Sequence, residues 1–218
     1  PTSKEASEAV DRALTTALNG RTLQAGFAKE LRERLTAEDI KAALAWFASP
    51  LGTRLDSLEV AAVTPEGMAV FMKLRDLPPE KQGSSNLLAR ARRLDAAVRA
   101  SDHMTDMLFE SQSALAKAWY AAGSGNKKES FEQLQKRALP NRAAVRAQVE
   151  KQVLATTIHT YGSLTDAEWD QFLAFTESET GQHLNAAAAS GLRQMMLNVA
   201  EQLGKIVPPK TPAAAKTE

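Results

Sequence analysis

Cysteine is absent from the 218-residue chain, and this absence excludes several kinds of chemistry. Without a thiol, this sequence supplies no disulfide bond, no thiolate metal ligand and no cysteine nucleophile. Aromatic residues are also scarce, at 6% of the chain, and runs of β-branched residues are few. Because strands are enriched in aromatic and β-branched side chains, this composition favours helices over a β-sandwich or a β-barrel.

An excess of charge of either sign is also lacking. Lys and Arg together number 27 and Asp and Glu 26, which gives a formal net charge of +1. Such a balance creates no general field for nucleic acid or an anionic membrane, so no nucleic-acid partner is predicted. Four arginines that flank an apolar stripe are interpreted as a solvated helix face: Arg90, Arg92, Arg93 and Arg99.

Long apolar runs are the third absence. No stretch approaches the roughly 20 apolar residues that a membrane-spanning helix needs, so no transmembrane segment is predicted. The chain begins at Pro1 rather than at a methionine, which fits removal of a signal peptide or a tag. We therefore expect a periplasmic or secreted protein, with a cytoplasmic location as the alternative.

Apolar residues recur at spacings of three and four along most of the chain, which is the pattern of amphipathic helices. Thr36–Asp39 and Thr165–Glu168 have the form of capping boxes, in which a hydroxyl and a carboxylate satisfy free N–H groups at a helix start. Ser49-Pro50 and Thr64-Pro65 each place a hydroxyl before a proline at the first helical position. No segment alternates with period two for long enough to form a strand. We predict an all-α protein, a multi-helix bundle with about nine or ten helices.

The same periodicity predicts which side chains point inward. For the three helices that follow Thr36, Ser49 and Thr64, the expected inward residues are Ile40, Ala43, Leu44, Phe47, Leu51, Leu55, Leu58, Met68, Phe71 and Met72. Further predicted elements are a helix at 3–18, a loop at 123–126 and a short helix containing Phe131 and Leu134.

Composition divides the chain into two helical halves and a tail. Pro78-Pro79 and residues 82–85 form the clearest connector, since proline, glycine and serine interrupt the helical pattern there. We therefore predict an N-terminal half at 1–77 and a C-terminal half at 84–206. The Pro/Ala/Lys-rich residues 207–218 are predicted to be a disordered tail.

Two stretches of the chain resemble each other. Residues 35–55 align without gaps on 164–184, with identities at Leu35/Leu164, Thr36/Thr165, Leu44/Leu173, Ala45/Ala174, Ser49/Ser178, Gly52/Gly181 and Leu55/Leu184. Each stretch predicts a helix, a corner and a second helix, with a glycine that permits close approach of backbones at the corner. The predicted structural motif comprises Thr36, Ser49, Pro50, Gly52, Thr165, Ser178 and Gly181. Two ordinary helical hairpins with common cap chemistry are the alternative interpretation.

The string of Leu-Thr, an acidic residue, an aromatic residue and then Ser-Pro-x-Gly resembles the bacterial family of unknown function DUF2059. The first stretch carries Trp46-Phe47 and Ser49–Gly52, and the second carries Phe175, Ser178 and Gly181. The resemblance implies a helical fold and export to the periplasm. It implies no catalytic residue, because none is assigned to the family.

The polar residues do not predict a reaction. His103, His159 and His183 lie in three distant segments, without the spacing of metal ligands on a helix, so we predict no metal site. The sequence contains no Gly-x-Ser-x-Gly nucleophile motif. Asp166 and Glu168 lie at a predicted helix start, where the helix dipole already favours acidic side chains. No cofactor and no catalytic residue are predicted.

The leading hypothesis is a non-enzymatic envelope protein that binds a protein partner or an apolar small molecule on a helical surface. The candidate binding surface consists of Trp46, Phe47, Trp169 and Phe175. A hydrolase-like enzyme with a site assembled across several helices is the main alternative. A purely structural or oligomerising module is the third, and the sequence does not predict an oligomeric state.

Overall fold

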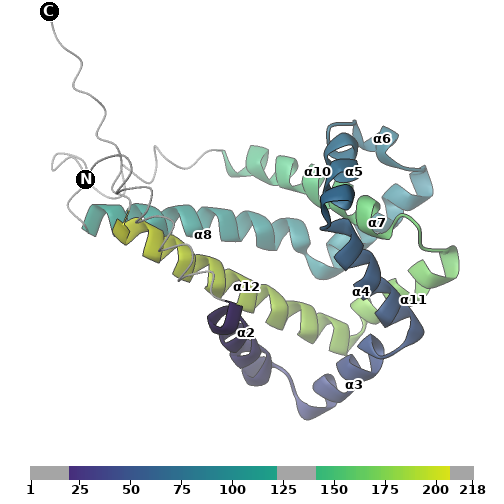
Figure 1. Ribbon diagram of the computed structural model, residues 1–218, viewed down its shortest axis with the longest axis horizontal. Helices are drawn as coiled ribbons and strands as arrows, with labels where there is room; N and C mark the ends of the chain where they lie inside the picture. Colours follow the sequence, from purple (N-terminus) through teal and green to yellow (C-terminus); the bar gives the residue numbers. More distant parts are fainter. Residues whose placement is uncertain (1–19, 122–140, 207–218) are drawn as a thin grey trace, which may run out of the picture. The chain divides into compact units, whose positions relative to one another are not determined.

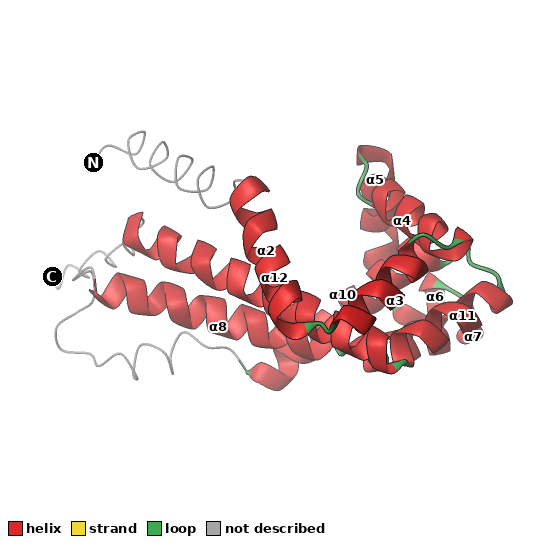
Figure 2. Ribbon diagram, turned by 90° about the horizontal axis from the view of Figure 1, so that it is seen from below, coloured by secondary structure: helices red, strands yellow, loops and turns green. Residues whose placement is uncertain are grey.

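The computed structural model describes residues 20–121 and 141–206, and within these ranges it contains ten helices and no strand (Figures 1 and 2). They are α2 (Gly20–Arg34), α3 (Ala37–Phe47), α4 (Pro50–Ala62), α5 (Pro65–Arg75), α6 (Pro79–Gln82), α7 (Ser85–Val98), α8 (Ala100–Ala121), α10 (Arg142–Tyr161), α11 (Asp166–Glu177) and α12 (Glu179–Ile206). The predicted all-α fold is confirmed. The predictions for 3–18, 123–126, Phe131, Leu134 and 207–218 lie outside the described residues.

The chain forms two compact units, each assembled from segments that are distant in sequence. Of the described residues, one unit combines 20–28, 106–121, 141 and 191–206, and the other combines Lys29–Thr105 and Arg142–Ser190. In the first unit, Arg193 of α12 donates to Glu110 of α8, with 2.7 Å between Nη2 and Oε1. This ion pair links the two long helices of that unit.

The second unit contains the larger core. Its main cluster of buried apolar residues joins α4, α7 and α11 and consists of Leu51, Leu55, Leu94, Leu164, Trp169, Phe172 and Leu173. A smaller cluster of Leu88, Ala91, Leu154 and Ile158 joins α7 to α10. Each large buried apolar side chain contributes roughly 1.5–3 kcal/mol relative to an exposed one. These two clusters therefore fix α7 between α10 and α11.

Three helices of the second unit begin at the same kind of corner. In each, a Ser or Thr hydroxyl accepts a hydrogen bond from the N–H of a glycine three residues later. The pairs are Ser49–Gly52, Thr64–Gly67 and Ser178–Gly181, at 3.0, 3.1 and 3.1 Å. The hydroxyl satisfies one of the free N–H groups of the helix start, as expected of an N-cap.

The glycine at each corner allows the new helix to lie against the end of the preceding one. A Cβ atom at Gly52 would lie 2.2 Å from the carbonyl oxygen of Trp46, and at Gly181 it would lie 2.0 Å from that of Phe175. Gly67 has the same restriction, with the Ala61 carbonyl oxygen at 2.2 Å. The sequence comparison identified Gly52 and Gly181 but missed Gly67, although Thr64-Pro65 carries the same start signal.

The predicted inward face of α3 is wrong for three of its residues. Ile40, Leu44 and Phe47 are 38%, 65% and 53% exposed. Asp39, which is 5% exposed, points inward instead, because its carboxylate forms the capping box with Thr36 and also contacts His183. The helix is therefore rotated so that part of its apolar stripe faces solvent.

The prediction for α5 is also wrong in part. Phe71 is buried, as expected, but Met68 and Met72 are 41% and 44% exposed. α5 packs against α10, where the ring of Phe71 lies 5.7 Å from that of His159. α5 also contacts α4, but Met68 and Met72 are not covered by either helix and remain at the surface.

Candidate functional site

The helices α3 and α11 meet through an aromatic stack. The rings of Trp46 and Phe175 lie 4.2 Å apart between centroids, with 4° between their planes. The two residues occupy equivalent positions in the two similar stretches of sequence. A stacked pair of this kind stabilises a contact beyond the apolar area that it buries.

Two polar contacts flank the stack, and they are reciprocal. Asp39 of α3 contacts His183 of α12, with 3.1 Å from Nδ1 to each carboxylate oxygen. Glu168 of α11 pairs with Arg54 of α4, with 3.2 Å between Oε1 and Nε. Asp39 and Glu168 are equivalent in the aligned stretches, and so are Arg54 and His183. Each capping-box carboxylate thus contacts the basic side chain of the other hairpin.

The capping boxes also determine the charge of these carboxylates. Hydrogen bonds from Thr36, first from its backbone N–H and then from its hydroxyl, lower the pKa of Asp39, and the contact with His183 lowers it further. The N–H and hydroxyl of Thr165 lower the pKa of Glu168 in the same way. Both groups are therefore held in the ionised form. The hydroxyl of Thr36 donates to Asp39 at 2.9 Å and accepts from the backbone N–H of Asp39, so it serves as a helix cap.

The outer side of α11 is covered by α7, which lies beside it (Figures 1 and 2). Arg93 of α7 forms a two-pronged ion pair with Glu177, at 2.6 and 2.7 Å. Arg90 pairs with Asp166, and its side chain is only 16% exposed. Arg93 is 56% exposed, as expected of a solvated face, whereas Arg90 is mostly covered. Both arginines contact acidic residues that are distant in sequence.

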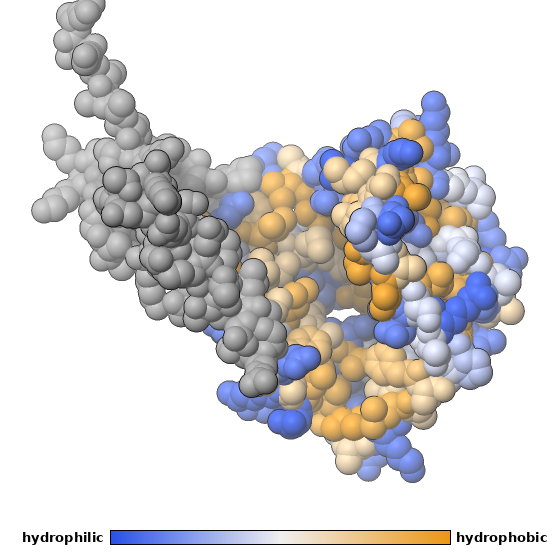
Figure 3. Space-filling model, viewed as in Figure 1, coloured by the Kyte–Doolittle hydropathy of each residue, from blue (hydrophilic) through white to orange (hydrophobic). Residues whose placement is uncertain are grey.

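A surface of exposed apolar side chains follows α3, α4 and α5. We name it the α3–α5 surface and define it by Ile40, Leu44, Phe47, Val60, Val63, Met68, Val70 and Met72, which are between 38% and 72% exposed. In the space-filling view, apolar residues gather over α3 and again over α4 and α5 (Figure 3). Exposed apolar patches of this kind mark interaction sites.

The four residues of the predicted binding surface differ in their environment. Phe47 is 53% exposed and belongs to the α3–α5 surface, whereas Trp46 and Phe175 are half-buried in their mutual stack. Trp169 is 1% exposed and lies in the core, with Tyr161 packed edge-on against it at 6.2 Å. The structure thus brings Trp46 and Phe175 together, leaves Phe47 at the surface and buries Trp169.

Polar side chains elsewhere in the second unit serve to connect helices. The hydroxyl of Tyr161 donates to Glu59 at 2.6 Å, and burial together with this carboxylate raises the pKa of Tyr161 above its usual range. Asp95 accepts from the N–H and hydroxyl of Ser101 at 2.8 and 2.7 Å, across the turn between α7 and α8. Within the described ranges, no group of His, Asp and Glu residues is arranged to hold a metal ion.

Comparison with known proteins gives one match. Residues 21–74, about a quarter of the chain, match a family described as "Uncharacterized protein conserved in bacteria (DUF2059)". This match confirms the resemblance carried by the first stretch, whereas 164–184 lies outside it, so the second copy stays a prediction. Neither the curated proteins nor the solved structures contain a significant match to the chain.

The matched segment contains the whole α3–α5 surface. In the part of the chain that the structure describes, none of the helices combines the length and the apolar character that crossing a membrane requires. The sequence already contained a signal for this surface, namely more apolar residues on α3 and α5 than one buried face can use.

Proposed function

We propose that the protein is a non-enzymatic interaction protein that binds a protein partner through the α3–α5 surface. One observation carries the proposal: large apolar side chains gather on three consecutive helices, and Leu44, Val60 and Val63 are 65%, 60% and 72% exposed. Burial of apolar surface by a partner contributes roughly 25 cal/mol of favourable free energy for each Å². A partner that covers this surface recovers that free energy.

The geometry favours a protein partner over an apolar small molecule. Small-molecule sites enclose most of the ligand surface, whereas a protein interface covers about 800 Å² on each partner. Side chains as exposed as Leu44 and Val63 would leave a small ligand largely in water. Met68 and Met72 on α5 add flexible, polarisable side chains that adapt to the shape of a partner.

We further propose that this binding takes place in the periplasm. The support is the resemblance to DUF2059, which implies export, and the lack of cysteine is compatible with an oxidising compartment. Fractionation of cells that express the native gene would test the location. Recovery in the periplasmic fraction is expected, and a purely cytosolic signal would contradict it.

The binding function can be tested by capture from envelope extract with chemical cross-linking and mass spectrometry. The test variant combines Val63→Gln, at the residue that follows α4, with Met68→Gln and Val70→Gln on α5. The control combines Leu77→Gln and Leu192→Gln, whose side chains are 42% and 41% exposed outside the α3–α5 surface. We expect the wild type and the control variant to capture the same proteins, and the test variant to lose them. Identical capture by all three would contradict the proposed function.

A further inference from the structure

The two similar hairpins, α3–α4 and α11–α12, differ in whether another helix of the second unit covers them. The hairpin of α11 and α12 is covered by α7, and Leu173 of α11 is 1% exposed. The residue equivalent to Leu173 in the other hairpin is Leu44 of α3, which is 65% exposed. Equivalent faces are thus buried in one hairpin and open in the other.

The reciprocal contacts show that the two faces are comparable. The Trp46–Phe175 stack joins equivalent residues, and the Asp39–His183 contact has its counterpart in Arg54–Glu168. Contacts of this type, in which each side uses the same positions, are those of a two-fold arrangement. The orientation of α3 relative to its hairpin therefore corresponds to that of α11, and the place that α7 occupies on α11 has an equivalent on α3.

The contacts between α7 and α11 indicate what kind of helix would pack at the equivalent position on α3. α7 places Leu94 in the apolar cluster with Trp169 and Leu173. Arg90 of α7 meets the acidic side chains on the same edge of α11, and its Nη2 lies 3.9 Å from Asp170. The occupant of α11 is thus an amphipathic helix with an apolar stripe and a basic side chain beside it.

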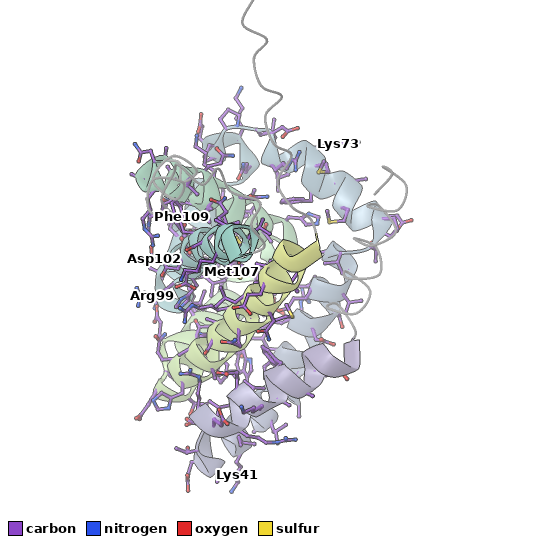
Figure 4. The ribbon with its side chains drawn as sticks, turned by 90° about the vertical axis from the view of Figure 1, so that its left-hand side faces the viewer. Lys41, Lys73, Arg99, Asp102, Met107 and Phe109 are labelled. Carbon is purple, nitrogen blue, oxygen red and sulfur yellow. The ribbon has the colours of Figure 1, made fainter. Side chains whose placement is uncertain are left out.

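On α3 the charge is reversed. The position equivalent to Asp170 is Lys41, which is exposed and projects from α3 (Figure 4). Among the described residues Lys41 forms no ion pair, and it lies about one helical turn before Leu44. The positions equivalent to Asp166 and Glu177 are alanines, Ala37 and Ala48. We consider a helix that packs on α3 in the way that α7 packs on α11. Its apolar stripe would contact Leu44, and its edge would face the positive charge of Lys41.

We infer that α3 is the docking site for an amphipathic helix of a partner protein, with leucine-like residues on its buried stripe and a carboxylate opposite Lys41. This inference rests on the proposed function and specifies the partner's chemistry. A helix with the sequence of α7 would bind less tightly, since its Arg90 would face Lys41. The mode is helix-on-helix recognition through residues spaced three and four apart.

The inference can be tested with stapled helical peptides and the full chain. The probe has the sequence of α7, residues 85–98, with Arg90→Glu, and its control is the unchanged α7 sequence. Binding is measured by fluorescence anisotropy of the labelled peptide. We expect saturable binding of the acidic peptide that is about two- to fivefold tighter than that of the basic control, the range for one exposed charge pair.

Two protein variants locate the site. Leu44→Glu should weaken binding at least about tenfold, because burial of one leucine contributes more than 1.4 kcal/mol. Leu77→Glu, at a residue that is 42% exposed outside the α3–α5 surface, should leave binding unchanged. Lys41→Glu should reverse the preference, so that the basic peptide binds more tightly than the acidic one.

Several outcomes would overturn the inference. The absence of saturable binding would do so, and so would binding that Leu44→Glu does not weaken, which would indicate a different site. A Leu44-dependent dimer in sedimentation would assign the face to a second copy, and Leu44-dependent binding to phosphatidylglycerol vesicles would assign it to a membrane. If the peptides fail while envelope capture still depends on Val63, Met68 and Val70, the inference fails and the proposed function stands.

Discussion

At the scale of single residues, the corner glycines leave no room for a side chain. Gly52 and Gly181 each follow a serine cap, and the carbonyl oxygen that a Cβ atom would meet belongs to the backbone of the preceding helix. A flexible side chain could move aside, but a backbone carbonyl moves only with its helix. The same carbonyls belong to Trp46 and Phe175, so a shift at either corner would also disturb the aromatic stack.

Replacing either corner glycine with alanine should therefore destabilise the fold. We expect Gly52→Ala and Gly181→Ala each to lower the free energy of unfolding by about 1–3 kcal/mol, the usual cost of overpacking. Gly26 on α2 is the control, because a Cβ atom there would meet nothing within 4 Å. Gly26→Ala should leave stability unchanged or raise it by up to about 1 kcal/mol through helix propensity. Urea unfolding curves would measure all three, and an equal response would contradict the role of the corners.

Replacing the two neighbouring aromatic residues of α3 should destabilise the fold to different degrees. Trp46 stacks on Phe175, whereas the side chain of Phe47 is 53% exposed. We expect Trp46→Ala to cost about 2–3 kcal/mol, somewhat below the range for fully buried aromatics. Phe47→Ala should cost about 0.5 kcal/mol or less, as is usual for surface positions. Thermal unfolding of the two variants measures the difference, and a larger loss for Phe47→Ala would mean that Phe47 is buried.

At the scale of helices, local chemistry was predictable from the sequence and packing was only partly so. The caps at Thr36, Ser49 and Thr165 depend on residues within one turn, and the structure contains all three. The burial of Leu44 depends on whether another helix covers it, and periodicity carries no information on that point. Likewise, the arginines of α7 could be placed on one face, but their acidic partners on α11 are distant in sequence.

The capping boxes predict how stability depends on pH. The pKa of Asp39 and that of Glu168 are both lowered in the folded protein, so their contribution is present above the ordinary carboxyl pKa of about 4 and is lost as the pH falls through the folded value. We expect the urea midpoint to fall steeply below about pH 4. Asp39→Asn should lower the midpoint near neutral pH and flatten the curve, because the ionised cap is gone.

The matched control for this experiment is Asp56→Asn, which removes an exposed carboxylate from α4. Its midpoint should follow the wild-type curve across the same pH range. A curve for Asp39→Asn that parallels the wild type from neutral to acidic pH would show that Asp39 contributes no pH-dependent stability. The His183 contact would then have to be assigned a purely steric role.

At the scale of the whole molecule, the folded units are not continuous in sequence. In the second unit, Leu51 and Leu55 of α4 are buried against residues that lie after the predicted connector at 78–85, such as Leu94 and Trp169. The segment that matches the bacterial family, 21–74, therefore supplies one side of a core whose other side comes from α7 and α11. Composition and proline content can predict a connector, but they cannot predict that the segments on either side of it share a core.

A chain divided at this connector should therefore fold only when its two parts are combined. We expect the fragment 1–83 to show little helix by circular dichroism, since its helices are short and isolated helices of that length are marginal in water. Mixing it with 84–218 should restore a helical signal that unfolds cooperatively, because Leu51 and Leu55 regain the buried surfaces of Leu94 and Trp169. The same mixture with Trp169→Ala in the second fragment should associate at least about tenfold more weakly, since a lost buried tryptophan costs about 3–5 kcal/mol. A fragment 1–83 that is helical and cooperatively folded alone would show instead that the N-terminal half is an independent domain.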